Sequence, residues 1–275
     1  MPSPSPPPDS PDRLDPDVLV APALLARLVH VAEAGSTMDL ARARATESHA
    51  VLPLAVVADR QTMGRGRRGA GWWQPPGSLA VSLVIETAAF ADSAFPQAAW
   101  SLACGVAVAE SIRRLAPAVA THVRWPNDVE VAGRKLAGIL LETAAGGSRV
   151  IFGIGVNTTG TAAAAPPALA HRVATLPDLT GTSLDRQPLI AELVPRLFTL
   201  LTAMAADPEA LAVRYRPLCC LTGRSVTVHV GHERHTGICQ GIAADGRLLL
   251  DTPAGRLGLA SGSLTPPADV WPGKA

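Results

Sequence analysis

A glycine- and arginine-rich segment, residues 59–77, most strongly constrains how this chain can fold. Its sequence is DRQTMGRGRRGAGWWQPPG, with five glycines, four arginines, two tryptophans and a Pro-Pro pair. It follows residues 54–58, whose apolar and β-branched side chains predict a buried strand. Glycine lets a backbone approach a ligand closely, and arginine offers planar donors suited to phosphate or carboxylate. We therefore expect a loop that closes over an anion.

The spacing of Gly64, Gly66 and Gly69 also matches G-x-G-x-x-G, the dinucleotide-binding fingerprint. That fingerprint requires a helix to begin at the glycines, so that its first amides hold the pyrophosphate. Here the glycines continue into the tryptophans and prolines of residues 72–77, which disfavour the first turns of a helix. No HRD or DFG sequence follows, which argues against a kinase glycine loop. A solvated basic turn or a nucleic-acid-binding arm remains as the alternative.

Composition indicates one large domain and a small one in a chain of 275 residues, with 48% hydrophobic and 17% charged residues. A net charge of +1 gives no global attraction to nucleic acid or to an anionic membrane. The four cysteines show no CxxC spacing, and we find no signal-peptide pattern. We also find no apolar span of about 18 to 20 residues. These features predict a soluble, cytoplasmic protein.

The hydrophobic pattern predicts strands and helices first, and then a C-terminal region of short strands. Strands are expected at 28–34, 78–86, 129–131, 135–143 and 150–156, and helices at about 40–46, 96–116, 189–204 and 208–215. Four short strands at 225–230, 236–243, 247–251 and 256–260 predict a small β-barrel. We divide the chain into a disordered proline-rich tail (1–16), a main domain (17–217), the barrel (218–267) and a loose tail (268–275), with a loop or linker at 162–170.

Two local features, the Ser36-Thr37 pair and a set of three histidines, have competing interpretations. Ser36 and Thr37 precede a predicted helix, where they can cap it or present hydroxyls and amides to a ligand. His229, His232 and His235 match no standard zinc spacing, and we do not expect a metal there.

Lys135 is unusual because 24 cationic residues include only two lysines, the other being Lys274. A lysine that enters an apolar strand in an arginine-rich chain either extends its charge to solvent or contacts a single carboxylate oxygen.

Four motifs in order carry a family resemblance: GSTMD, RQTMGRGRRGAGW, RWPNDVEVAGRKLAGILLE and GIGVN, followed by the predicted barrel. Together they resemble biotin protein ligases, over roughly residues 28–264. The resemblance implies an α+β fold with a mixed-sheet catalytic domain of the biotin/lipoate ligase type and a small SH3-like C-terminal barrel. Regulatory members of that family carry an N-terminal DNA-binding domain. Here a proline-rich tail precedes the motifs, which implies an enzyme without repressor function.

The resemblance also implies a reaction. Such enzymes use ATP and Mg²⁺ to convert biotin to biotinyl-5′-AMP, releasing pyrophosphate, and then transfer biotin to one lysine of a biotin carboxyl carrier domain. We expect no nucleic-acid or membrane partner and a monomer or homodimer. By motif match, the catalytic residues would be Lys135, Arg67 and Arg65. The biotin-binding set would be Ser36, Thr37, Met38, Gln61, Gly64, Arg65, Gly66, Arg67, Lys135 and Gly138. The adenylate set would be Arg68, Trp72, Asn127, Asp128 and Asn157, with Asp128 as the Mg²⁺ ligand.

Three residues depart from the family pattern. Met38 stands where asparagine is common, Ala70 where a basic residue is common, and Arg124 where lysine is usual. The loss of a side-chain hydrogen-bonding group at Met38 keeps a second hypothesis open, a ligase for lipoate or another small acid. A third hypothesis is a non-catalytic sensor of biotin or its adenylate.

Overall fold

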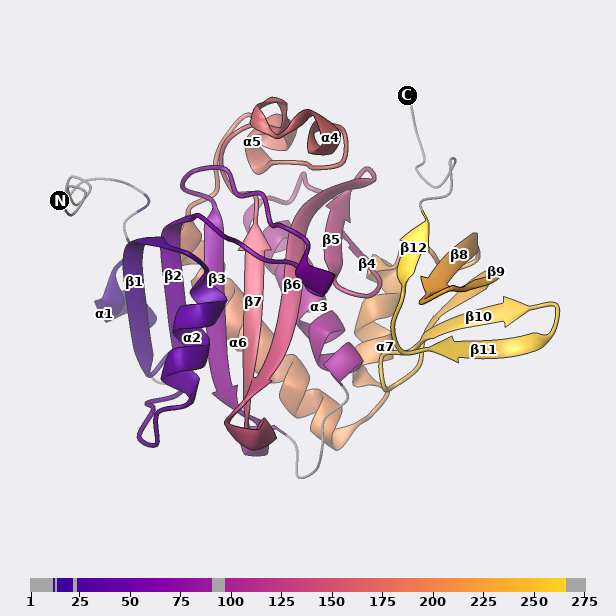
Figure 1. The fold of residues 1–275 in the computed structure, drawn as a ribbon, viewed down its shortest axis with the longest axis horizontal. Coiled ribbons are helices and arrows are strands. Elements are labelled where there is room, and N and C mark those ends of the chain that lie inside the picture. The colour runs from indigo at the N-terminus through magenta and orange to yellow at the C-terminus, as the bar shows by residue number, and fades with distance from the viewer. Residues whose placement is uncertain (1–11, 13, 22–23, 91–96, 266–275) are drawn as a thin grey trace.

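A mixed seven-stranded sheet organises the main domain of the computed structural model, which describes residues 12, 14–21, 24–90 and 97–265 (Figure 1). In spatial order its strands are β1 (Arg27–Ala34), β2 (Leu54–Gln61), β3 (Leu79–Glu86), β7 (Arg149–Val156), β6 (Arg134–Ala144), β5 (Asp128–Val131) and β4 (His122–Arg124). β1 and β2 pair in parallel, and the other neighbours pair antiparallel. The predicted α+β class with a mixed sheet is confirmed.

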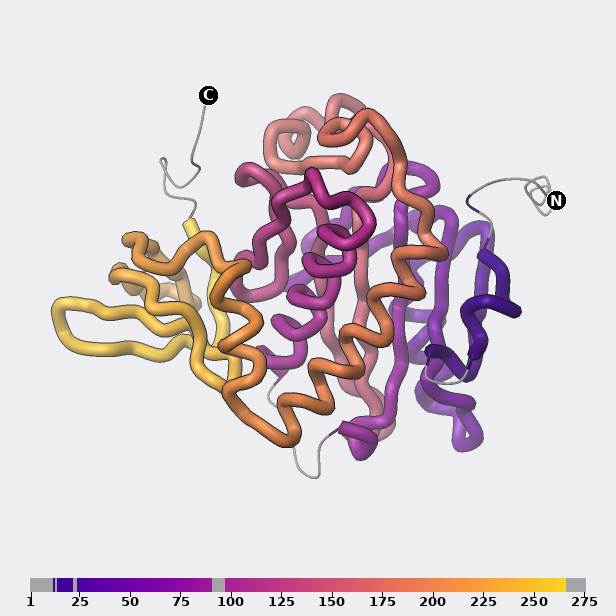
Figure 2. The backbone as a smooth tube through the Cα atoms, turned by 180° about the vertical axis from the view of Figure 1, so that it is seen from behind, coloured from indigo at the N-terminus to yellow at the C-terminus, as the bar shows by residue number. Residues whose placement is uncertain are grey.

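Helices cover the two faces of this sheet unequally. The face seen in Figure 2 carries α3 (Gln97–Leu115) and α6 (Arg186–Ala206), the two longest of the described helices. Every residue of α3 from Ala99 to Ala109 is buried, because the helix lies between the sheet and α6. The opposite face carries the short α2 (Thr37–Ala45) and the glycine-arginine segment. That face is therefore covered by shorter elements than the other.

The small C-terminal domain is a five-stranded antiparallel sheet beside β4 (Figure 1). In spatial order its strands are β11 (Gly255–Leu259), β10 (Leu248–Thr252), β9 (Glu233–Ile242), β8 (Ser225–Val230) and β12 (Ser263–Thr265). Trp125 is buried between the domains, and its Nε1 donates to the Gly246 carbonyl over 3.1 Å. Arg124 Nη2 donates to the Leu264 carbonyl over 3.2 Å. These contacts fix the small domain against the β4–β5 turn.

The predicted strands and helices are confirmed with shifted ends, and several short elements were missed. The missed elements are β4, β12, α1 (Pro16–Leu19), α4 (Pro167–Ala170) and α5 (Leu176–Thr180). The α4 helix lies within the segment predicted as a loop or linker. β4 and β12 each have three residues, too few for a period to be read from the sequence. The predicted helix start at Pro96, residues 266–267 and the tail 268–275 lie outside the described residues.

The prediction of a disordered tail over residues 1–16 was wrong for its last residues. Leu14 is buried in the main core, and Asp15 accepts a hydrogen bond from Asp17 N as the cap of α1. Asp12 forms an ion pair with the buried Arg186, with Nε 2.9 Å from a carboxylate oxygen. Leu14 and Asp12 thus contact the folded domain. Residues 1–11 and 13 lie outside the described residues.

The expectation of no long apolar span was also wrong. Among the described helices, α6 is long and apolar enough to cross a membrane by length and composition alone. Its Leu189, Leu193, Leu197 and Leu200 are buried in the main core, where the helix packs on α3. A buried core helix passes the same test, so this composition is weak evidence for a membrane span.

Candidate active site

A cavity of about 390 Å³ lies over β3, β6 and β7, between the start of α2 and the glycine-arginine segment. Most of the predicted site residues line it: Ser36, Thr37, Met38, Gln61, Arg65, Gly66, Arg67, Arg68, Trp72, Asn127, Asp128, Lys135 and Gly138. Residues far apart in the chain thus converge on one site.

Small residues form the floor of the cavity. Gly138 and Gly155 are cross-strand partners on β6 and β7, and Ala80 on β3 continues the row. The Trp72 ring lies directly on this row, since a Cβ added at Gly155 would come within 2.5 Å of its ring carbons. The Trp72 Nε1 atom is buried and has no hydrogen-bond partner among the described residues. It is a donor available to a ligand.

One end of the cavity is neutral. Ser36 caps α2, with its Oγ accepting from Met38 N over 3.3 Å. Thr37 N and Oγ1 both donate to Gln61 Oε1, over 2.9 and 3.2 Å. Ser82 on β3 donates to the Thr37 hydroxyl over 2.9 Å. Ser36 thus serves as a helix cap, one of its two predicted roles, and it also lines the cavity.

The glycine-arginine segment crosses above the sheet and is closed by its own backbone. Trp72 N donates to the Gly64 carbonyl over 2.9 Å, and Gly66 N donates to the Ala70 carbonyl over 2.7 Å. Arg68 lies in a left-handed conformation with φ of 55°. This tight turn places successive arginine side chains on different sides of the segment, so they make different contacts.

Arg65 makes a two-point contact with Asp39 of α2. Nη1 and Nη2 donate to the two carboxylate oxygens over 2.8 and 2.7 Å. The hydrogen bond from Arg65 holds the pKa of Asp39 below its usual range. Asp39 also accepts from Arg42, which in turn pairs with Glu142 of β6. The first half of the segment is thereby attached to α2.

Arg67 makes no such ion pair within the described residues. Its Nη1 donates to Asn127 Oδ1 over 3.2 Å, and Asn127 Nδ2 donates to the Ile139 carbonyl over 2.9 Å. Burial, followed by the nearby Arg68 charge, lowers the pKa of Arg67. Arginine remains charged at neutral pH in spite of such a shift. Arg67 is therefore a partly buried cation whose charge is directed at the cavity.

Lys135 lines the cavity from the start of β6. Its Nζ lies 2.6 Å from Asp128 Oδ1 and 5.4 Å from the centre of the Trp72 ring. Its stem covers Gly138, where an added Cβ would lie 2.8 Å from Lys135 Cε. Its backbone N donates to the Arg172 carbonyl over 2.8 Å. The Lys135 side chain therefore forms part of the cavity lining.

Gly64 and Asn157 do not line the cavity, although the sequence placed both in the site. Gly64 packs against Gln61 and the Trp72 backbone, just behind the lining. Asn157 is buried. Its side-chain Nδ2 donates to the Ala174 carbonyl over 2.9 Å, and its backbone carbonyl accepts from Leu176 N over 3.0 Å. In this structure Asn157 holds the loop that precedes α5.

Sequence reasoning missed several lining residues and one contact. Arg172, Trp125, Ser263 and Leu264 line the cavity, and Asp39 holds Arg65 from outside the lining. Ser263 and Leu264 come from β12, so the small domain forms part of the cavity wall. The Trp-Pro-Asn-Asp motif contained the signal for Trp125. Nothing local in the sequence marks Arg172 or β12.

Of His229, His232 and His235, the first and the last have partners on the small domain. His229 Nε2 lies 2.6 Å from Thr265 Oγ1, and His235 Nε2 lies 3.1 Å from Glu233 Oε2. Each has a local partner on the same sheet.

Comparison with known proteins identifies two family regions. Residues 34–158 match the biotin/lipoate A/B protein ligase family, and residues 222–263 match the biotin protein ligase C-terminal domain. The first region contains most of the cavity lining, and the second extends to Ser263 of the cavity wall.

Individual relatives agree with this assignment. The chain is 34% identical over 227 residues to a biotin-[acetyl-CoA-carboxylase] ligase of Mycobacterium tuberculosis, covering 80% of this chain and 82% of that protein. It is 34% identical over 220 residues to the enzyme of the same name from Paracoccus denitrificans, covering 73% of this chain and 85% of that protein. A solved biotin protein ligase from Aquifex aeolicus in complex with biotin and ATP superposes with a TM-score of 0.74 and 26% identity, covering 87% of this chain and 97% of that one. The chain therefore belongs to the biotin/lipoate A/B protein ligase family and is an enzyme of the biotin protein ligase type.

Proposed function

We propose that this enzyme joins biotin to ATP as biotinyl-5′-AMP, with release of pyrophosphate, and then transfers biotin to a lysine of a biotin carboxyl carrier domain. The observation that carries the proposal is the division of charge along one cavity. The end formed by Ser36, Thr37, Met38 and Gln61 is neutral. Cations lie along the rest of the lining: Arg65, Arg67, Arg68, Arg124, Lys135 and Arg172. Against them the described lining holds one carboxylate, Asp128.

This division suits a neutral head group at one end and a polyphosphate at the other. Two of the cations are already neutralised, Arg65 by Asp39 and Arg124 by Glu130 over 3.0 Å. Arg67, Arg68 and Arg172 make no ion pair with the described residues at the distances of a salt bridge, and Lys135 shares its charge with Asp128. A polyanion bound in this cavity would therefore meet a lining with more cations than carboxylates.

Lys135 and Arg67 address the main barrier of the first step. A carboxylate must attack the α-phosphorus of a polyanion, and the two like charges repel. A cation that hydrogen-bonds to both groups offsets this repulsion, and each such bond contributes about 1.5–3 kcal/mol. Lys135 lines the cavity beside Gly138 and the Trp72 ring, and its compact ammonium can contact the carboxylate and then the oxygens of the new anhydride.

Trp72 and the glycine-arginine segment protect the mixed anhydride, the product of the first step, from water. A mixed anhydride is hydrolysed if water reaches it. The Trp72 ring rests on Gly155, and its Nε1, which has no partner among the described residues, is a donor for a ligand beside it. Exclusion of water also strengthens the charge interactions inside the site.

Asp128 fits a magnesium ion that arrives with ATP. Mg²⁺ commonly binds through one or two carboxylates together with substrate phosphates and water. Asp128 Oδ1 is a buried carboxylate oxygen on the lining, and its partner is the Lys135 ammonium. The bound ion would supply neutralisation of phosphate charge. Asp128 holds Lys135 in place as well as offering this ligand.

We propose the carrier domain of acetyl-CoA carboxylase as the acceptor, because the Mycobacterium and Paracoccus relatives are named for that substrate. The second step needs only an amine nucleophile, which attacks the activated carbonyl and releases AMP.

The decisive test is biotin-dependent exchange of labelled pyrophosphate into ATP, run with biotin, with lipoate and with no acid. Exchange with biotin alone is expected. Met38 motivates the lipoate control, because its buried sulfur faces Gly153 at the neutral end, where a thioether gives no strong hydrogen bond to a ureido group. Exchange with lipoate alone would replace biotin as the substrate, and biotin binding without exchange would indicate a sensor.

A further inference from the structure

Gln74 lies outside the cavity lining but contacts a residue that forms it. It sits at the end of the glycine-arginine segment, and its Oε1 accepts from Gln61 Nε2 over 3.3 Å. Gln61 lines the neutral end of the cavity. None of the sequence motifs assigns a role to Gln74.

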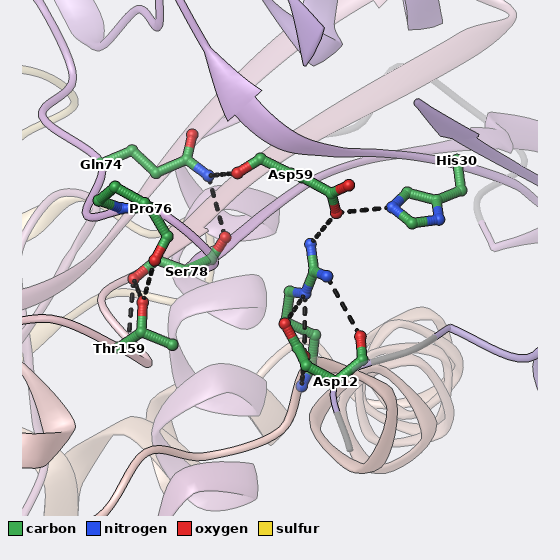
Figure 3. Close-up of polar contacts among 8 residues, drawn as sticks. Asp12, His30, Asp59, Gln74, Pro76, Ser78 and Thr159 are labelled. Carbon is green, nitrogen blue, oxygen red and sulfur yellow. Dashed lines mark hydrogen bonds and ion pairs between the residues drawn. The ribbon is translucent and has the colours of Figure 1, made fainter. Parts of the chain in front are cut away.

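The orientation of the Gln74 amide is set by two backbone carbonyls. Its Nε2 donates to the Ser78 carbonyl over 2.9 Å and to the Asp59 carbonyl over 3.4 Å (Figure 3). A carbonyl oxygen can only accept, so the nitrogen must face these two atoms. The Gln74 oxygen must then face Gln61.

The orientation of the Gln61 amide is set independently at its other end. Thr37 N is a donor only, and it lies 2.9 Å from Gln61 Oε1. The Gln61 nitrogen therefore faces Gln74, in agreement with the acceptor that Gln74 presents. One of its two hydrogens is used in this contact, and among the described residues no partner takes the other. That hydrogen is left for an acceptor atom of a ligand.

Asp59 and Ser78, whose carbonyls hold Gln74, are themselves held by further contacts. The Asp59 carboxylate accepts from Arg186 Nη1 over 2.6 Å and lies 2.7 Å from His30 Nε2 (Figure 3). The Ser78 hydroxyl lies 2.9 Å from the Thr159 hydroxyl. Both carbonyls that hold Gln74 thus belong to residues fixed by other contacts.

We propose that Gln74 is a positioning residue for ligand recognition: it holds the Gln61 amide at its outer end, so that a donor faces the head group before the ligand arrives. This deepens the proposed function and relies on it only for the probe. A fixed amide binds an acceptor oxygen without the cost of ordering a free side chain. The chain's thioether at Met38 makes this donor more important, because Met38 supplies no strong one.

The test is a double-mutant cycle with biotin as the probe, measured by titration calorimetry on the full chain. Gln74→Met should weaken biotin binding by about two- to tenfold, the effect of freeing one side chain. In a Gln61→Met background the same Gln74→Met change should have no further effect. Gln187→Met, at a glutamine outside the cavity lining whose Oε1 accepts from Asp15 N, is the matched control and should bind like the parent.

Two results would overturn the proposal. One is unchanged biotin affinity of Gln74→Met; the other is that Gln74→Met weakens biotin binding as much in the Gln61→Met background as in the parent. The second result would mean that Gln74 acts on the loop and not through Gln61. If Gln74→Met unfolds, Gln74→Asn removes the same contact, since it is one methylene shorter.

A ligand-free measurement separates this inference from the proposed function. In the spectrum of the ¹⁵N-labelled protein, the side-chain amide of Gln61 should show two well-separated proton signals. In Gln74→Met the separation between these two signals should decrease. A parent chain that binds no biotin would refute the proposed ligand, while these signals would still decide the role of Gln74. Identical Gln61 signals in both proteins would refute that role.

Discussion

Arg65 and Asp39 face each other through two hydrogen bonds of 2.7 and 2.8 Å, which join the glycine-arginine segment to the first turn of α2. The motif resemblance assigns Arg65 to the ligand, yet in this structure its guanidinium is bound by a carboxylate of the protein. The contact positions the segment, and the Arg65 backbone remains beside the cavity.

The role of Asp39 can be tested by Asp39→Ala. We expect affinity for a non-hydrolysable biotinyl-adenylate analogue to fall by about three- to tenfold, because the segment loses its attachment to α2. Arg65→Ala together with Asp39→Ala should be no weaker than either single variant. Tighter binding by Asp39→Ala would mean instead that Asp39 competes with the ligand for Arg65.

Lys135→Met should abolish most of the pyrophosphate exchange. The removal of one cation from the reacting oxygens costs about 100- to 1,000-fold in rate when the group acts on the transition state. The loss of stability should be small compared with the loss of rate, because the Lys135 and Asp128 side chains are both partly exposed and the substitution does not open the core. Lys135→Arg keeps the charge without the compact shape and should recover only part of the rate. Unchanged exchange with an unchanged melting temperature would exclude Lys135 from the chemistry.

Gly155→Ala should displace Trp72. The new Cβ would lie 2.5 Å from the ring carbons Cε2 and Cζ2, so the indole has to move. We expect kcat/KM for ATP to fall by about 10- to 100-fold, as misplaced site groups commonly cause. A smaller ring in the same background, Trp72→Phe, should recover part of the melting temperature that Gly155→Ala loses. Normal kinetics in Gly155→Ala would show that the ring does not depend on this floor.

Asp59→Asn should destabilise the fold by about 1–3 kcal/mol at pH 7, because the buried Arg186 loses one of its two carboxylate partners. Burial raises the pKa of Asp59, but hydrogen bonds from His30 and Arg186 outweigh it and keep the pKa below its ordinary value. A lowered folded-state pKa stabilises above the ordinary value and loses this effect as the pH falls through the folded-state pKa.

Urea unfolding at neutral pH and at a series of acidic pH values checks this expectation. The difference between the parent and Asp59→Asn should be full at pH 7 and disappear as Asp59 is protonated in the folded parent. Asp251→Asn, which breaks an exposed pair with Arg256, is the control and should cause no measurable change. A difference that is constant down to the lowest pH would contradict the assignment to Asp59.

Ala132→Asn should stabilise the β5–β6 turn. Ala132 and Gly133 have φ of 45° and 79° between the paired residues Val131 and Arg134, the geometry of a type I′ hairpin turn. Alanine is disfavoured there and asparagine is tolerated. The melting temperature should rise by about 1–3 °C, and Ala132→Val should lower it because a β-branched residue is strained at positive φ. The opposite order in thermal melts would refute this reading of the turn.

The neutral end of the site was predictable because its residues lie at ends of adjacent elements. The motifs around Ser36 and Gln61 follow β1 and precede the segment after β2. These two strands pair in parallel, with Ala34 opposite Gln61. The carboxyl ends of parallel neighbours meet at one edge of a sheet, so two motifs at such ends must meet.

Other parts of the site depend on packing that no local pattern encodes. Asn157 was expected in the site from its match to the family motif GIGVN, but the direction of its amide depends on the loop at Ala174, which is distant in sequence. Arg172 and Leu264 reach the cavity only through the placement of that loop and of the small domain. The Arg65–Asp39 contact joins residues 26 positions apart, beyond any helical or strand period.

The RWPND motif spans the border between the two domains: Arg124 and Trp125 bind the small domain, and Asn127 and Asp128 line the cavity. The border between the two domains therefore falls within a motif that also forms the cavity, and it does not coincide with a border of the site. A chimera that exchanges only the C-terminal domain between two family members would separate Trp125 from the carbonyl and the glycine against which it packs. Such an exchange should transfer residues 124–128 together with the domain, so that the cavity wall is inherited as one unit.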